Sequence, residues 1–234
     1  MRVTLNDDFL GIFPDASIHL LVCRNVPALS TVDVERWKDR ARVCVEASGI
    51  TRQCLSERVE FLEWRTAYAR FGLKPGKFPS SIEQLWKRAL EGRFIHTPVK
   101  LVDLYCHASL IALVPMGGYD LDRIAGNLRV RLSEQTEQFL AIGEKQALSV
   151  AQGIVVYADN ADIVCFGWNH RDSVRTCLRP ETRRAIFFAD SATGKSRLRA
   201  ATGLELMAEA LKESGCELSR ELLDHHRTGV EITL

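Results

Sequence analysis

The chain has 234 residues, of which 46% are hydrophobic and 26% are charged, and its net charge at neutral pH is +1. This composition is typical of a globular protein, and the near-neutral charge excludes a global basic field that would attract nucleic acid. The first residues, MRVTLNDD, lack the apolar stretch of a signal peptide, and no apolar run approaches the roughly 20 residues that a membrane helix needs. We therefore expect a cytoplasmic protein with no membrane partner.

The seven cysteines are scattered along the chain, and no two of them form a CxxC pair. This pattern predicts neither a zinc site nor a disulfide framework. Most of the cysteines stand among apolar residues, as expected of reduced side chains that pack in a core. We expect no metal and no cofactor.

Helical periodicity dominates the first half of the chain. Two strands are expected before the helices, at Arg2–Leu5 and Ile18–Val26. Apolar spacing, capping residues and terminal glycines then predict four helices: one capped by Ser30 or Thr31 and ending near Ala47, one over 58–71, one from Ser80 or Ser81 to Gly92, and one over 99–113.

After Ile124 the apolar period changes from 3.6 to 2. Short strands are predicted at 128–132, 138–142, 154–158, 163–167 and 185–189, followed by a helix over 196–214 and an edge strand in the final GVEITL. Helices and strands are segregated, so we expect an α+β fold with mixed, mostly antiparallel sheets. We expect a single domain over 1–234, with residues 1–60 as a strand–helix extension packed onto it.

A double glycine follows the helix predicted over 99–113. Asp103 and His107 lie four residues apart on one face of that helix, and Gly117-Gly118 then precede Tyr119-Asp120. Spacing alone favours a core helix and a tight turn, with Asp120 as the N-cap of a short helix through Ile124. The alternative is a turn whose glycines let a ligand approach the backbone closely.

The segment WNHRDS, residues 168–173, directly follows a predicted strand. Loops at strand ends commonly carry functional side chains. Arg171 and Arg175 are candidates for gripping a phosphate or carboxylate, Trp168 for stacking on a base, and His170 with Asp172 for acid–base chemistry. The alternative is a structural loop held by an Arg171–Asp172 interaction and a turn at Asn169.

Two further segments have competing interpretations. Residues 65–93 are locally basic with interleaved aromatic residues, which indicates either an RNA-facing surface that includes Lys74, Lys77, Lys87 and Arg88 or a solvated helix face. The segment ADSATGKS, residues 189–196, fits a relaxed P-loop pattern after an apolar strand. Because Ala189 replaces the first glycine and few residues follow, a polar loop and helix start is favoured there.

Several blocks in fixed order resemble a known family. They are Ser80-Ser81 before LWKRALEG, then LVDLY, GGYDLDRI, LRVRL, Ile142-Gly143, VVYAD and PETRRAIFF. From about residue 78 to 190 the chain resembles the editing domain of the phenylalanyl-tRNA synthetase β subunit, modules B-three and B-four. The small size resembles the free-standing relatives of this domain. The resemblance implies the fold of that domain and hydrolysis of the ester of mischarged tRNA, and it does not imply a complete tRNA ligase.

The resemblance also carries over individual positions. Asp103 matches the aspartate of the family's helix, and Tyr119-Asp120 match its phenylalanine–aspartate pair. Three polar residues of the family are replaced, its asparagine by Cys106, its histidine by Gly117 and its pocket glutamate by Phe188. A site built to bind a hydroxyl loses discrimination without its polar partners, so we expect a substrate other than tyrosyl-tRNA. The expected substrate-binding residues are Asp103, Cys106, Gly117, Gly118, Tyr119, Trp168, Asn169, Arg171, Arg175 and Phe188.

The leading hypothesis is a trans-acting aminoacyl-tRNA deacylase whose pocket lies between Gly117-Gly118 and residues 168–173. Water is the nucleophile, with Asp172, His170 or Asp120 as the catalytic candidates. The expected partner is tRNA or aminoacyl-tRNA, and not DNA. One alternative is a non-catalytic module that binds tRNA or a free amino acid as a partner or sensor. A weaker one is a hydrolase of small aminoacyl esters. The amino acid, the tRNA and the oligomeric state are left open.

Overall fold

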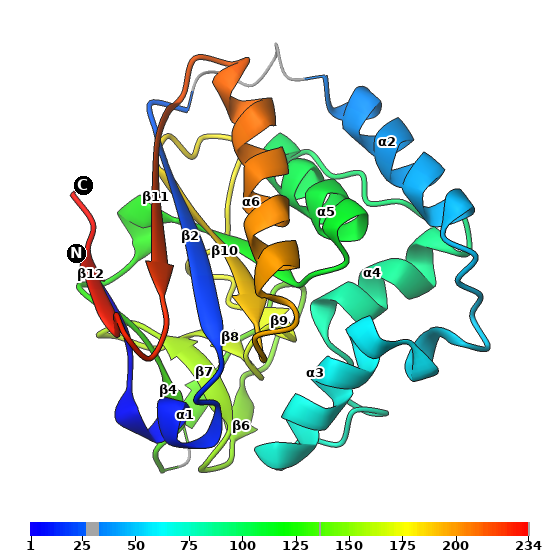
Figure 1. The fold of residues 1–234 in the computed structure, drawn as a ribbon. Helices are drawn as coiled ribbons and strands as arrows, with labels where there is room; N and C mark the ends of the chain where they lie inside the picture. The colour runs from blue at the N-terminus through cyan, green and yellow to red at the C-terminus, as the bar shows by residue number, and fades with distance from the viewer. Residues whose placement is uncertain (27–32, 136, 234) are drawn as a thin grey trace.

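Two β-sheets form the centre of the protein in the computed structural model (Figure 1). The structure describes residues 1–26, 33–135 and 137–233. Buried side chains from both sheets share one hydrophobic core. The six-stranded sheet has the order β12-β1-β4-β7-β8-β9, and β1 and β4 are its parallel pair. Its strands are β1 (Arg2–Leu5), β4 (Leu128–Leu132), β7 (Val155–Ala158), β8 (Ile163–Phe166), β9 (Arg171–Asp172) and β12 (Gly229–Glu231).

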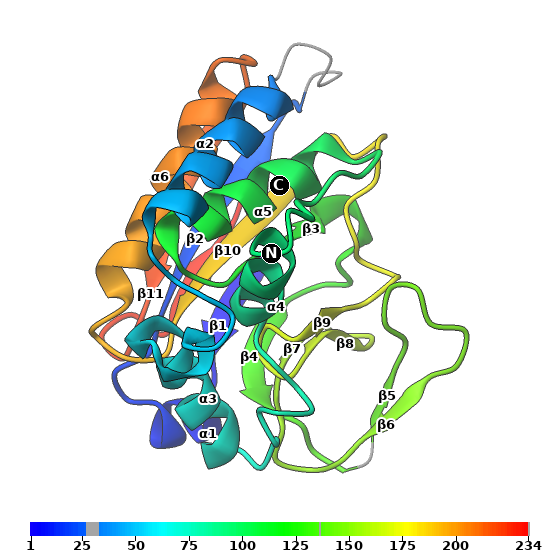
Figure 2. The same cartoon turned by 90° about the vertical axis from the view of Figure 1, so that its right-hand side faces the viewer.

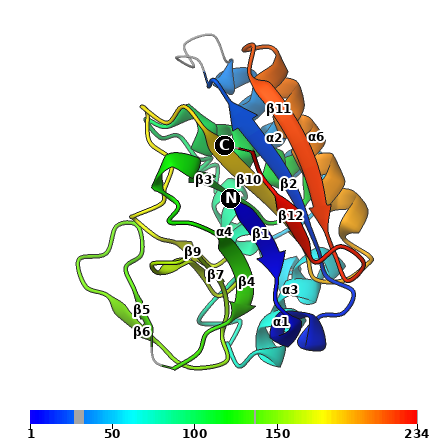
Figure 3. The ribbon, with the colours of Figure 1, turned by 90° about the vertical axis from the view of Figure 1, so that its left-hand side faces the viewer.

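The four-stranded sheet has the order β11-β2-β10-β3, and all its neighbours are antiparallel. Its strands are β2 (Ser17–Arg24), β3 (Met116–Asp120), β10 (Ala185–Ser191) and β11 (Glu217–Leu223). A separate hairpin of β5 (Glu137–Phe139) and β6 (Leu148–Val150) projects on the side away from α6 and β11 (Figure 3).

Helices cover the outer face of the four-stranded sheet. Figure 2 shows α5 (Lys100–Ala112) and α6 (Arg197–Lys212) on that face, with α2 (Val34–Ala47) beside α5. The remaining helices are α1 (Asp7–Ile12), α3 (Val59–Arg70) and α4 (Ser81–Ala89), with short 3-10 turns at Leu55–Glu57 and Leu121–Arg123. None of the helices within the described ranges is long and apolar enough to cross a membrane.

Strand β10 separates two hydrophobic cores, because successive side chains of a strand point to opposite faces. Ile186 and Phe188 belong to the core shared with the six-stranded sheet. Ala185, Phe187 and Ala189 belong to the core under α5 and α6. Both faces are therefore buried, and Asp190 comes at the end of the face that points toward the six-stranded sheet.

The predicted α+β class is confirmed, as are most of the strands and helices. The turn expected at Gly117-Gly118 is wrong, because both glycines lie in β3, where Gly117 pairs with Phe188. Glycine is rare in strands, so the sequence favoured a turn, but pairing along β10 supplies the ladder hydrogen bonds. The N-cap predicted at Asp120 is confirmed, because its carboxylate accepts a hydrogen bond from the backbone N–H of Asp122 in the 3-10 turn that follows.

Other elements were missed or shortened. The strand expected over 138–142 ends at Phe139, and α1, β6, β9 and the polar edge strand β11 were not anticipated. The caps expected at Ser30 and Thr31 lie outside the described residues. Asp33 is the N-cap of α2, and its carboxylate accepts the N–H of Arg36 at 3.0 Å.

Candidate functional site

A cavity of about 290 Å³ lies between the two sheets, and we call it the Asp190 pocket. Strands β3 and β10 form one wall, and β7, β8 and the segment 168–172 form the other. Its lining residues are Ser81, Met116, Gly117, Tyr119, Ile142, Tyr157, Cys165, Trp168, Asn169, His170, Arg171, Asp172, Phe188 and Asp190.

Asp190 is a buried carboxylate whose hydrogen-bond partners are all neutral. The hydroxyl of Tyr157 donates to Oδ1 at 2.5 Å, and the amide of Asn169 donates to Oδ2 at 3.3 Å. The hydroxyl of Tyr68 in turn donates to Oδ1 of Asn169 at 2.8 Å and fixes that amide. Burial raises the pKa of Asp190 to about 7, and Asp172 adds to the rise, while the donated hydrogen bonds partly oppose it. This carboxyl can therefore take up and release a proton near neutral pH.

Asp172 is a second carboxylate in the same pocket. Its Oδ1 accepts a hydrogen bond from the hydroxyl of Tyr119 at 3.0 Å. Burial raises its pKa, against hydrogen bonds from Cys165 and Tyr119 that lower it. In the part of the chain that the structure describes, neither Asp172 nor Asp190 has a cationic side chain within 4.0 Å. The pocket thus holds two carboxyl groups without a countercharge.

His170 has a defined tautomer. Its Nδ1 lies 2.7 Å from the carbonyl oxygen of Pro79, so Nδ1 carries the proton and donates it. Burial lowers the pKa of the ring, and the Pro79 hydrogen bond only partly opposes this. His170 is therefore neutral at pH 7, and its Nε2 is a hydrogen-bond acceptor.

Trp168 anchors the pocket wall rather than offering a free ring. Its backbone has a φ of +64°, which is rare for a residue other than glycine, and its side chain is fully buried. The indole packs edge-on against Phe9, Phe13 and Trp64, with ring centroids 4.9, 4.8 and 5.0 Å away. A ring packed on this many sides has no face left for a base.

The adjacent glycines of β3 face opposite ways. A Cβ added at Gly117 would meet only the hydroxyl of Tyr119, at 3.6 Å. A Cβ at Gly118 would lie 2.7 Å from the ring of Phe187, which no real structure tolerates without a shift. Gly117 therefore leaves free space in the pocket, whereas Gly118 allows β3 to pack against the core under α5.

The structure places several sequence-predicted site residues outside the pocket. Asp103 accepts hydrogen bonds from the backbone and hydroxyl of Thr97, and Cys106 is buried in α5. The carboxylate of Asp120 accepts a hydrogen bond from the hydroxyl of Thr182 at 2.7 Å. Successive side chains of β3 point to opposite faces, so Asp120 points away from the pocket that Tyr119 faces.

The two arginine candidates are held by carboxylates. Arg175 donates to Asp159 at 2.7 Å and lies 3.4 Å from Asp162, so it fastens loops outside the pocket. Arg171 lines the pocket, but it pairs with Glu144 at 3.0 Å rather than with Asp172.

Of the predicted RNA-binding residues, Lys74 and Lys77 are exposed in the loop between α3 and α4, and Arg88 is exposed on α4. Lys87 donates to the buried carboxylate of Glu83 at 2.7 Å.

Sequence reasoning missed Asp190 and its donor Tyr157. The available signal was an aspartate two residues after Phe188 in the run AIFFAD, where alternation puts both side chains on one face. The donors Tyr157 and Tyr68 come from distant parts of the chain, and no local pattern joins them.

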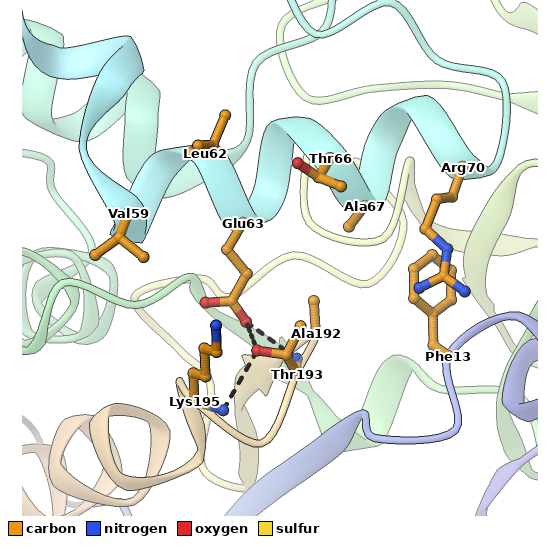
Figure 4. A pocket seen from close by; sticks show the side chains of 10 residues that line it. All are labelled: Phe13, Val59, Leu62, Glu63, Thr66, Ala67, Arg70, Ala192, Thr193 and Lys195. Carbon is orange, nitrogen blue, oxygen red and sulfur yellow. Dashed lines mark hydrogen bonds between the residues drawn. The ribbon is translucent and has the colours of Figure 1, made fainter.

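A second cavity, of about 230 Å³, lies between α3 and the ADSATGKS loop that follows β10 (Figure 4). Glu63 accepts hydrogen bonds there from the backbone N–H and hydroxyl of Thr193, at 3.0 and 2.8 Å, and from the hydroxyl of Ser196 at 2.5 Å. The polar groups of this loop are thus bound to a carboxylate of the protein itself. The arrangement gives no support to a nucleotide-binding P-loop.

Within the described residues, no group of three or more His, Cys, Asp or Glu side chains could hold a metal ion.

The family model for the B3/4 domain matches residues 63–223. The chain belongs to the B3/4 domain family. This match covers most of the chain and confirms the resemblance drawn from its sequence blocks. In the phenylalanyl-tRNA synthetase β subunit, the B3/4 domain is associated with editing and tRNA binding.

Among solved structures, this B3/4 domain protein is similar to the crystal structure of an N-terminal fragment of the phenylalanyl-tRNA synthetase β subunit from Pyrococcus horikoshii. The two are 12% identical and superpose with a TM-score of 0.46 over 92% of this chain and 49% of the other. The chain therefore spans about half the length of that fragment. A search of curated proteins gave no match.

Proposed function

We propose that this B3/4 domain protein hydrolyses the ester bond of mischarged aminoacyl-tRNA in trans, with the Asp190 pocket as its active site. The observation that carries the proposal is a buried carboxyl with a pKa of about 7, held by Tyr157 and Asn169 at the wall of a cavity. A base whose pKa lies near the working pH is the most effective at accepting a proton from water. The editing role associated with the family supports the choice of an aminoacyl ester.

In this mechanism Asp190 accepts a proton from a water molecule as the water oxygen attacks the ester carbonyl carbon. The bond between that carbon and the ribose oxygen then breaks, and the ribose oxygen takes up the proton from Asp190, which returns to its carboxylate form. The thiol of Cys165 is not the nucleophile, because burial raises its pKa well above the usual value and keeps it protonated.

Asp172 has a different role in the proposal. A carboxylate without a countercharge in a partly enclosed pocket is a partner for the α-ammonium group of the aminoacyl moiety. Beside it, Phe188 provides apolar surface, and Gly117 leaves room for a side chain. This lining supports an aminoacyl group with an apolar side chain rather than a phenol.

The test is a deacylation assay with a full panel of mischarged tRNAs. We expect release of at least one amino acid by the wild-type protein, loss of the activity in Asp190→Asn, and retention in Asp162→Asn, which alters an exposed carboxylate outside the pocket. The proposal fails if every tRNA stays charged while a synthetase editing domain clears its own substrate.

A non-catalytic module that binds tRNA or an amino acid is the second candidate. The replacements at Gly117 and Phe188 favour it, because both remove polar groups from the family's pocket. Binding without turnover would establish this function instead. The variants Asn169→Ala, Arg171→Ala and Asp172→Ala would then change only the binding affinity.

We also propose that residues 1–234 act as one structural unit in the cytoplasm. The N-terminal residues support this, because β2 pairs with both β10 and β11, and β1 pairs with β4 and β12. In this proposal residues 1–60 are an extension packed onto the rest of the domain, and they contribute one strand to each sheet.

A further inference from the structure

A second groove, of about 350 Å³, adjoins the Asp190 pocket, and we call it the Phe78 groove. The two cavities share His170 and Arg171, which line both. A ligand that reaches from one cavity into the other passes these two side chains. The lining of the groove also includes Phe78, Phe139, Leu148 and Phe166.

Aromatic rings form the main wall of the Phe78 groove. The ring of Phe166 lies 5.8 Å from both Phe78 and Phe139, and it is nearly parallel to Phe139, at 29°. The imidazole of His170 lies 5.4 Å from Phe78. Phe78 is only partly buried, and Leu148, the cross-strand partner of Phe139 in the β5–β6 hairpin, is 46% exposed. Phe139 and Phe166 are buried behind it, so the ring of Phe78 and the side chain of Leu148 are the apolar surface that is open to a ligand.

The charge around this groove is favourable to a phosphate. The ammonium group of Lys77 lies 5.3 Å from the Phe78 ring, and Lys77 is exposed. Glu144, the carboxylate that lines the groove, is neutralised by Arg171 at 3.0 Å. An aromatic wall with a cation at its rim matches a nucleotide, whose base stacks on rings and whose phosphate pairs with the cation.

We propose that the Phe78 groove binds the nucleobase and phosphate of the 3′-terminal adenosine nucleotide of tRNA, whose ribose carries the aminoacyl ester. This inference rests on the proposed function, because the ester has to reach Asp190 while its own nucleoside lies just outside the pocket. The shared residues His170 and Arg171 would then flank the ribose. Phe78 supplies the stacking surface, and Lys77 contacts the phosphate.

The first experiment measures binding of adenosine 5′-monophosphate to the full-length protein by calorimetry. Phe78→Leu keeps the apolar volume but removes the ring, so we expect affinity to fall about tenfold, as for the loss of a base–aromatic contact. Lys77→Gln weakens the same binding, and ribose 5-phosphate, which has no base, binds more weakly than the nucleotide. Leu198→Ala, which alters an exposed apolar residue on α6, leaves the affinity unchanged.

The second experiment compares steady-state deacylation. Phe78→Leu is expected to raise KM for the mischarged tRNA about tenfold with little change in kcat, because the ring positions substrate without touching the reacting atoms. If the nucleotide binds in a Phe78-dependent way and no tRNA is hydrolysed, the groove stands and the proposed function fails. If tRNA is hydrolysed but Phe78→Leu alters neither KM nor nucleotide binding, the groove proposal is overturned and the function stands.

Discussion

Asp159 and Asp190 are both buried carboxylates, and their surroundings are opposite. Asp159 accepts hydrogen bonds from Arg175 and from the backbone N–H groups of Ala125, Ala161 and Asp162. Burial alone would raise its pKa, but these donors outweigh it and lower the pKa below the usual value. Asp190 has only neutral donors, and its pKa is raised to about 7.

The difference separates a structural carboxylate from one suited to proton transfer. A cation and oriented backbone dipoles keep Asp159 ionised, and its charge fastens loops around Arg175. A carboxyl that only neutral groups contact is costly to ionise, and its proton is exchangeable at neutral pH. Matched substitutions at the two carboxylates should therefore have different consequences for activity and for stability.

The largest expected effect is on activity. Asp190→Asn keeps the shape of the side chain and removes the base, so the rate of tRNA deacylation should fall by about 10²–10⁴-fold. Single-turnover assays measure this loss. Asp159→Asn, a matched change at the other buried carboxylate, should keep the rate per folded molecule, and an equal loss in both variants would contradict the contrast.

The next effect is on stability at the structural carboxylate. Asp159→Asn removes a charge that is hydrogen-bonded to Arg175, at an expected cost of about 2 kcal/mol in the free energy of unfolding by urea. Because the folded state lowers the pKa of Asp159, its stabilisation is present above the unfolded pKa and is lost as pH falls through the folded pKa. The two proteins should therefore converge in stability in acid. Asp162→Asn, at a carboxylate that is 58% exposed, should cost less than about 0.5 kcal/mol.

Asp190 should affect stability in the opposite direction. Between the ordinary aspartate pKa of 3.8, which applies to the unfolded chain, and the folded pKa of about 7, the folded state keeps a proton that the unfolded chain has lost. Its contribution to stability is therefore complete below pH 3.8 and disappears as pH rises to about 7. At pH 8 we expect Asp190→Asn to be more stable than the wild type by about 1–3 kcal/mol in urea unfolding, with the gain shrinking in acid. A gain that does not vary with pH would contradict the raised pKa.

The smallest effects distinguish the two glycines of β3. Gly118→Ala forces a methyl group against Phe187 and should destabilise the fold by about 1–3 kcal/mol. Gly117→Ala should change thermal stability by less than about 0.5 kcal/mol, because its Cβ meets only the Tyr119 hydroxyl. The larger Gly117→His should alter which mischarged tRNAs are cleared. Equal destabilisation by both alanines would show that Gly117 does not face free space.

Sequence patterns predicted much of this molecule and missed its central carboxyl. Periodicity gave the main strands and helices, and the family blocks pointed to the space between Gly117 and residues 168–173, where a cavity lies. Tyr119 and Asp120 are adjacent in the sequence, and strand register decides which of the two side chains faces the cavity. Both were therefore candidates, although only Tyr119 lines the cavity. Arg175 and Asp159 are 16 residues apart, and their pairing depends on how the loops fold back.

The most direct test of the central claim is the pH dependence of single-turnover deacylation in the wild type and in Asp190→Asn. With Asp190 as the base, the wild-type rate rises with pH through an inflection near 7 and then levels off. The residual rate of Asp190→Asn lacks this inflection. A wild-type rate that is flat across neutral pH, or the same inflection in Asp190→Asn, would contradict the account and assign the proton transfer to another group.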